Sequence, residues 1–134
     1  MTKRGEIVNA IATALNGMTT NGYSYEKITY WQDTNTQEDK NHLDYRDTTE
    51  EEIEQNGYKG AILQIEISAI VLGDGALSAA EMGTLAIADI RQTINSLRIL
   101  GKVPLIRRSH KYVETKGKTA CLVEVEAEVK YKNK

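Results

Sequence analysis

Apolar residues recur along the chain with two periods, and the longer period predicts two helices. Positions 6–15 show the spacing of one face of an amphipathic helix, whose apolar members are Ile7, Val8, Ile11, Ala14 and Leu15. A longer stripe follows the capping-box pair Ser78 and Glu81, and consists of Met82, Leu85, Ala86, Ile90, Ile94 and Leu97. We therefore expect a helix over 6–15 and a second over 78–100, ended by Gly101.

The shorter period predicts four strands, at 23–32, 60–72, 103–114 and 119–131. In the last of them one face is apolar and the other carries glutamates; the apolar face consists of Cys121, Val123, Val125, Ala127, Val129 and Tyr131. A turn at Gly117 joins the last two strands as a hairpin. We predict an α+β fold in a single domain over 1–134: a mostly antiparallel four-stranded sheet with two helices packed on one face.

An acidic segment separates the first two predicted strands. Residues 33–56 hold nine acidic side chains against Lys40 and Arg46, so this segment carries −7 while the rest of the chain carries +5. Its only aliphatic residues are Leu43 and Ile53. We interpret it as a long acidic loop, because it offers little apolar surface to a core and shows no clear period.

A basic segment balances the acidic one. Residues 98–118 carry seven Lys and Arg side chains against Glu114 alone. They form either a surface for an acidic protein or for DNA, or a solvated edge strand protected by its charges. If copies dock head-to-tail, the two segments meet, and the predicted interface residues are Leu43, Asp44, Tyr45, Arg46, Asp47, Tyr58, Arg107, Arg108 and Lys111.

Composition excludes several classes of protein. The 134 residues are 40% hydrophobic and 27% charged, which is typical of a globular domain. No apolar run reaches the ~18 residues of a membrane span, and no secretory signal is recognisable. The net charge of −2 argues against general nucleic-acid binding. The single cysteine cannot form an internal disulfide, which is compatible with a reducing compartment.

Residues of chemically active types do not form a convincing active site. The metal-ligand types in the acidic segment, which are His42, Asp44, Asp47 and Glu50 to Glu52, lack the spacing of a rigid site. Ser109 and His110 are neighbours on a strand and should point to opposite faces. Cys121 should be buried, and the glycines at 73 and 75 should form a turn rather than a phosphate loop. We expect no catalytic residue, no metal and no cofactor.

The order and length of these elements resemble the tail terminator, or tail-completion, proteins of long-tailed bacteriophages. The resemblance rests on the helix 5–15, the strand 61–72 with its Gly-Asp-Gly break, the long helix 78–100, and the hairpin 105–131 with its Glu-x-Glu-x-Glu last strand. It covers nearly the whole chain. The early strand, which lacks the apolar, Pro-containing sequence often found in the family, and the long acidic segment depart from it.

The resemblance implies a structural protein of the virion, assembled in the bacterial cytoplasm. It implies a ring, typically of six subunits, that caps the head-proximal end of the tail tube and stops tube polymerisation. Its partners would be further copies of itself, the tail tube protein and the head–tail connector or head-completion protein. Genomic double-stranded DNA would pass through the lumen without specific binding.

Two other functions remain open at the level of sequence. The chain is alternatively another neck or head-closure adaptor of a phage, which would act in a similar way at a different junction of the particle. A small metal-dependent phage nuclease that holds Mg²⁺ on the acidic segment is the third hypothesis. The nuclease would need carboxylates on rigid elements that converge on one site, and the sequence shows no such set.

Overall fold

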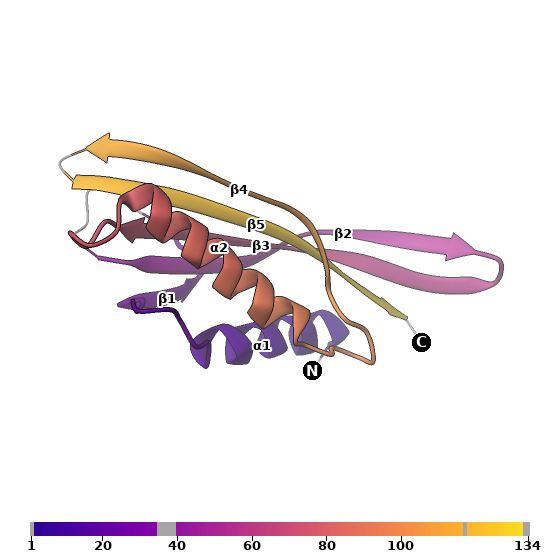
Figure 1. The fold of residues 1–134 in the computed structure, drawn as a ribbon. Coiled ribbons are helices and arrows are strands. Elements are labelled where there is room, and N and C mark those ends of the chain that lie inside the picture. Colours follow the sequence, from indigo (N-terminus) through magenta and orange to yellow (C-terminus); the bar gives the residue numbers. More distant parts are fainter. Residues whose placement is uncertain (1, 35–39, 117, 133–134) are drawn as a thin grey trace.

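The computed structural model describes residues 2–34, 40–116 and 118–132. Along the chain the elements are α1 (Lys3–Asn16), β1 (Lys27–Tyr30), β2 (His42–Gln55), β3 (Tyr58–Leu72), α2 (Ala79–Asn95), β4 (Leu105–Lys116) and β5 (Lys118–Lys132). The strands form one sheet in the order β1-β2-β3-β5-β4, and both helices lie on one side of it (Figure 1). The predicted α+β class is confirmed, but the sheet is mixed and has five strands instead of four.

The fifth strand lies within the acidic segment, so the prediction of a loop there is wrong for residues 42–55. β2 pairs antiparallel with β3 from His42 opposite Ile70 to Gln55 opposite Tyr58, with an irregularity between Asp47 and Glu50. β1 pairs parallel with the first residues of β2. Strand pairing uses main-chain groups, which acidic residues also possess, so a low apolar content did not prevent it. The part of the expected loop at positions 35–39 lies outside the described residues.

Two of the predicted elements are shorter than expected. The first strand is confined to Lys27–Tyr30, within the expected 23–32. Helix α2 ends at Asn95, where Ser96 caps it, and does not reach Leu100. Leu100 and Gly101 both have positive φ and form the centre of a tight turn in which Ile99 and Lys102 exchange two main-chain hydrogen bonds. Glycine at 101 therefore serves this turn, a geometry that requires positive φ, instead of the helix end.

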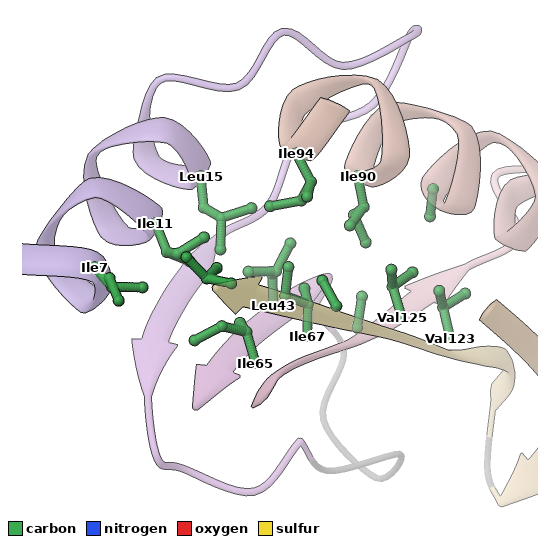
Figure 2. Packing of buried hydrophobic residues seen from close by; sticks show 14 of the residues in the cluster. Ile7, Ile11, Leu15, Leu43, Ile65, Ile67, Ile90, Ile94, Val123 and Val125 are labelled. Atoms are coloured by element: carbon green, nitrogen blue, oxygen red, sulfur yellow. The ribbon is translucent and has the colours of Figure 1, made fainter. Parts of the chain in front are cut away.

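The core lies between the helices and one face of the sheet (Figure 2). Helix α1 contributes Ile7, Ile11 and Leu15, whereas α2 contributes Met82, Ala86, Ile90 and Ile94. The sheet contributes alternate residues, which are Leu43 of β2, the odd-numbered residues 61–71 of β3 and the odd-numbered residues 121–131 of β5. The predicted apolar faces of both helices and of the last strand are thus confirmed. Neither of the two described helices is long and apolar enough to cross a membrane.

Candidate interaction surface

Asp47 of β2 joins the N-terminal helix to the sheet. Its side chain is only 8% exposed and forms an ion pair of 2.6 Å with Nε of Arg4 in α1. The hydroxyl of Tyr30 and Nε1 of Trp31 also donate to its Oδ1, the latter at 3.2 Å. Burial acts to raise the pKa of Asp47, but these hydrogen bonds outweigh it and hold the pKa below its ordinary value. Asp47 is therefore committed to contacts within its own chain.

Asp44 is held in a similar way on the opposite, open face of the sheet. It is 1% exposed, and its carboxylate accepts hydrogen bonds of 2.7 Å from both the hydroxyl of Thr29 and the main-chain nitrogen of Gln32. Arg46 binds the other oxygen through Nη2 at 2.8 Å and Nε at 3.1 Å. The same guanidinium lies 4.8 Å from the centre of the Trp31 ring, a cation–π contact. These contacts fasten the chain after β1 over the edge of the sheet.

These positions correct part of the predicted interface. Leu43 is fully buried in the core, and Asp44 and Asp47 are satisfied internally, so none of the three lies on an exposed loop. Tyr45 is half-buried against the ring of Tyr30. Tyr58 begins β3, and its side chain lies outside the described part of the structure. Burial follows from the alternation of β2, which the sequence pattern of this segment did not reveal.

Three basic residues of β4 pair with glutamates of the neighbouring strand β5. Nε of Arg108 lies 2.7 Å from Glu126, and Nε of Arg107 lies 3.6 Å from Glu128. Nε2 of His110 lies 3.5 Å from Glu124. Arg107 and Arg108 nevertheless remain more than half exposed, so both are accessible to a partner. Such exposed ion pairs contribute only ~0–1 kcal/mol each.

Lys111 faces the other way, toward the helices. Its Nζ donates to the carbonyl oxygen of Ala80 at 2.7 Å and lies 2.6 Å from the hydroxyl of Thr84, both in α2. Ser109 also faces the helices, where it accepts a hydrogen bond from Arg91. Because His110 contacts a glutamate on the open face, the prediction that Ser109 and His110 point to opposite faces is confirmed.

The open face of the sheet carries a row of four charged side chains, with two glutamates between two arginines. Glu66 of β3 lies directly opposite Glu126 of β5, a repulsive juxtaposition. Arg46 lies beside Glu66 in the register, and Arg108 beside Glu126. The row therefore reads plus, minus, minus, plus across four strands, with each glutamate next to one arginine.

The two long sides of the sheet differ in charge. β4 has only β5 as a neighbour among the described strands and carries Arg107, Arg108 and Lys111 against Glu114. On the other side, β1 covers β2 only from His42 to Tyr45. The following residues of β2 include four exposed glutamates, at positions 50, 51, 52 and 54. One border of the sheet is thus basic, and the other is acidic.

The basic border also exposes apolar side chains. Leu105, Tyr112 and Val113 of β4, together with Val103 just before it, each keep about half of their surface exposed. Isolated exposed apolar residues are common, but here they follow one strand edge. β4 thus combines charge with apolar area, as interface residues do.

Sequence reasoning missed Asp89, a buried carboxylate in α2. It accepts hydrogen bonds from both nitrogens of Asn21 and from the Tyr23 hydroxyl at 2.9 Å, which fixes the chain between α1 and β1. Burial is the main cause that raises the pKa of Tyr23, so its hydroxyl stays protonated as a donor. The signal was present in the sequence, because Asp89 lies in the apolar stripe of the helix, one position before Ile90.

Cys121 and Asp74, two residues of chemically active types, have structural roles. Cys121 is fully buried, as predicted, and burial raises the pKa of its thiol. The Gly-Asp-Gly segment at 73–75, which follows β3, forms a turn in which Asp74 accepts hydrogen bonds from the amides of Ala76 and Leu77. Within residues 2–34, 40–116 and 118–132, no three His, Cys, Asp or Glu side chains are grouped to hold a metal ion.

The chain matches no protein-family model, and no curated protein resembles it significantly.

Proposed function

We propose that the chain is a structural ring protein, and that it acts as a tail terminator of a long-tailed bacteriophage. The observation that carries the proposal is the opposite charge of the two borders of one sheet. A surface that is acidic on one side and basic on the other favours head-to-tail contacts between copies, and such contacts close into a ring when the rotation between copies is right. The order of helices and strands along the chain supports the resemblance to this family.

In this proposal the ring is a hexamer and sits at the head-proximal end of the tail tube in the virion. One of its faces binds the tail tube protein and stops its polymerisation, and the other receives the head–tail connector or head-completion protein. The chain needs no catalytic group for this role. Genomic DNA passes through the lumen without specific binding, which agrees with a net charge of −2 per subunit.

The oligomeric state tests the proposal first. Size-exclusion chromatography with light scattering should give a discrete species of about six times the 15.0 kDa of one chain. A monomer or dimer at all accessible concentrations would contradict the ring. A second measurement tests the role: the purified protein, added to polymerising tube protein, should cap tubes at one end and shorten them in electron micrographs. Discrete rings that leave tube length unchanged would favour another neck adaptor.

A further inference from the structure

We infer that neighbouring copies join through their main chains, by pairing β4 of one copy with residues 49–55 of β2 in the next. This inference rests on the ring proposed above and specifies how its subunits are joined. A single sheet would then continue from copy to copy around the ring. The strand that pairs with the free edge of β4 is thus the acidic edge of β2 in a second copy of this chain.

β4 is a strong template for an additional strand. It is twelve residues long and has a strand neighbour on one side only, within the described part of the sheet. An edge of this length presents a row of main-chain donors and acceptors, and proteins normally protect such edges from pairing. β4 has an irregularity near Arg107, but it also exposes Tyr112 and Val113. Burying these two side chains would favour pairing with another strand.

The complementary edge lies on the hairpin of β2 and β3. This hairpin extends beyond both helices at its turn (Figure 1). Past Tyr45, β3 is the one strand that pairs with β2 in the described residues. The edge 49–55 carries four glutamates around Ile53, so it is attracted to the basic edge of β4 and repelled by another copy of itself.

Sheet topology determines the direction of the contact. β2, β3, β5 and β4 are each antiparallel to the next, so β2 and β4 of one copy run in opposite directions. Copies that are related by rotation around an axis along the strands keep the same strand direction. The junction between β4 and the next β2 is therefore antiparallel, which is also the pairing with the more favourable hydrogen-bond geometry.

The faces of the two strands also match. Glu52 lies opposite the core residue Ala61, and Val113 lies opposite the core residue Cys121. Both Glu52 and Val113 therefore belong to the face that the helices cover. A continuous sheet brings Glu52 to the side of Val113 and Lys111, while Ile53 falls on the open face with Tyr112. All helices of the assembly then lie on one side of the sheet.

The short strand β1 limits the register. It occupies the β2 edge from His42 to Tyr45, so the neighbouring β4 has to lie beyond Tyr45. Successive copies are consequently displaced along the strand direction. In a closed sheet such a displacement tilts the strands relative to the axis, as it does in β-barrels.

Paired cysteine variants test the contact. One variant carries Glu52→Cys and the other Val113→Cys, and a short bis-maleimide reagent links thiols that lie close together. We expect each variant alone to give no covalent dimer and an equimolar mixture of the two to give dimers only. The double variant should give a ladder of covalent species that ends at the subunit number from light scattering. Cys121 is buried, and the unsubstituted chain reports any background reaction.

A matched control pair uses an exposed helical position. Gln92→Cys on α2, mixed with Val113→Cys, should give no dimer above background. Hydrogen exchange then separates main-chain pairing from side-chain docking: peptides over 49–55 and 105–116 should exchange at least about tenfold more slowly in the ring than in dissociated chains.

Three outcomes would overturn the inference. Rings without mixed dimers or slowed exchange would retain the ring and reject this junction. Dimers of Val113→Cys alone would show that β4 pairs with β4 of a second copy. A strictly monomeric chain would reject both the junction and the proposed ring.

Discussion

A Cβ atom placed on Gly83 would lie 2.3 Å from Sγ of Cys121, closer than any real contact. Gly83 is in the second turn of α2, and Cys121 is in β5. The absence of a side chain at 83 therefore allows the helix to rest directly on the strand. The aliphatic chain of Lys111 also lies close to this position, with its Cδ atom 3.2 Å from the added Cβ. Glycine occupies this position although it costs ~1 kcal/mol in a helix relative to alanine.

We predict that Gly83→Ala lowers the free energy of unfolding by about 1–3 kcal/mol, measured by chemical denaturation. Helix propensity alone would make the same change stabilising, so the sign of the effect reports the clash. Adding Cys121→Ala removes the sulfur and should restore part of the loss. Gln92→Ala, on the exposed side of α2, should be nearly neutral. A Gly83→Ala variant more stable than the parent would show that the helix does not pack this closely.

The capping box at the start of α2 gives a second prediction. The Ser78 hydroxyl accepts a hydrogen bond of 3.2 Å from the amide of Glu81, and the Glu81 carboxylate accepts one of 3.0 Å from the amide of Ser78. Ser78→Ala removes one acceptor and should lower the free energy of unfolding by about 0.5–2 kcal/mol. We expect a smaller loss for Glu81→Ala, whose side chain is exposed. An unchanged melting temperature for Ser78→Ala would contradict this helix start.

The contacts of Asp47 predict a pH dependence. Because the pKa of its carboxyl is lowered in the folded chain, Asp47 contributes stability that is fully present above the ordinary value of 3.8 and is lost as the pH falls through the folded pKa. Asp47→Asn should lower stability at pH 7 by about 1–3 kcal/mol, since Arg4 loses its charged partner. The variant should also lose less stability than the parent on acidification.

Asp33→Asn is the matched control for this prediction. Asp33 also contacts an arginine, at 3.4 Å from Arg46, but its side chain is 97% exposed. We expect Asp33→Asn to change the free energy of unfolding by no more than ~0.5 kcal/mol. The loss of stability on acidification should be the same as in the parent. Denaturation curves at pH 3 to 7 give the free energy of unfolding of the parent and of both variants. If Asp47→Asn and the parent lose the same stability on acidification, the ionised Asp47 has no structural role.

Charge reversal on β4 tests the electrostatic part of assembly. The double change Arg107→Glu and Arg108→Glu should slow ring formation and raise the concentration that assembly requires, because the acidic edge of the next copy is then repelled. Added salt should reduce the difference from the parent by screening. The same double reversal at Arg98 and Lys102, outside β4, should have a smaller effect. Light scattering at several salt concentrations is the measurement, and unchanged assembly would refute this pairing of charges.

The sequence pattern was sufficient for the elements whose stability comes from a continuous apolar face. The stripes of α1 and α2 and the alternation of β3 and β5 are each visible within one segment, because the buried face repeats with the period of the element. The capping box of Ser78 and Glu81 and the burial of Cys121 follow from such local patterns too. Each of these predictions is confirmed in the structure.

The acidic strand β2 depended on residues far away in the sequence. Its backbone is satisfied by β3, its Asp47 by Arg4 of the first helix, and its Asp44 by the chain after β1. None of these partners repeats with a period inside the segment, so local pattern indicated a loop. The acidic and basic borders likewise arose only when β3 and β5 took the centre of the sheet and left β2 and β4 near its edges, because strand order is decided by tertiary packing.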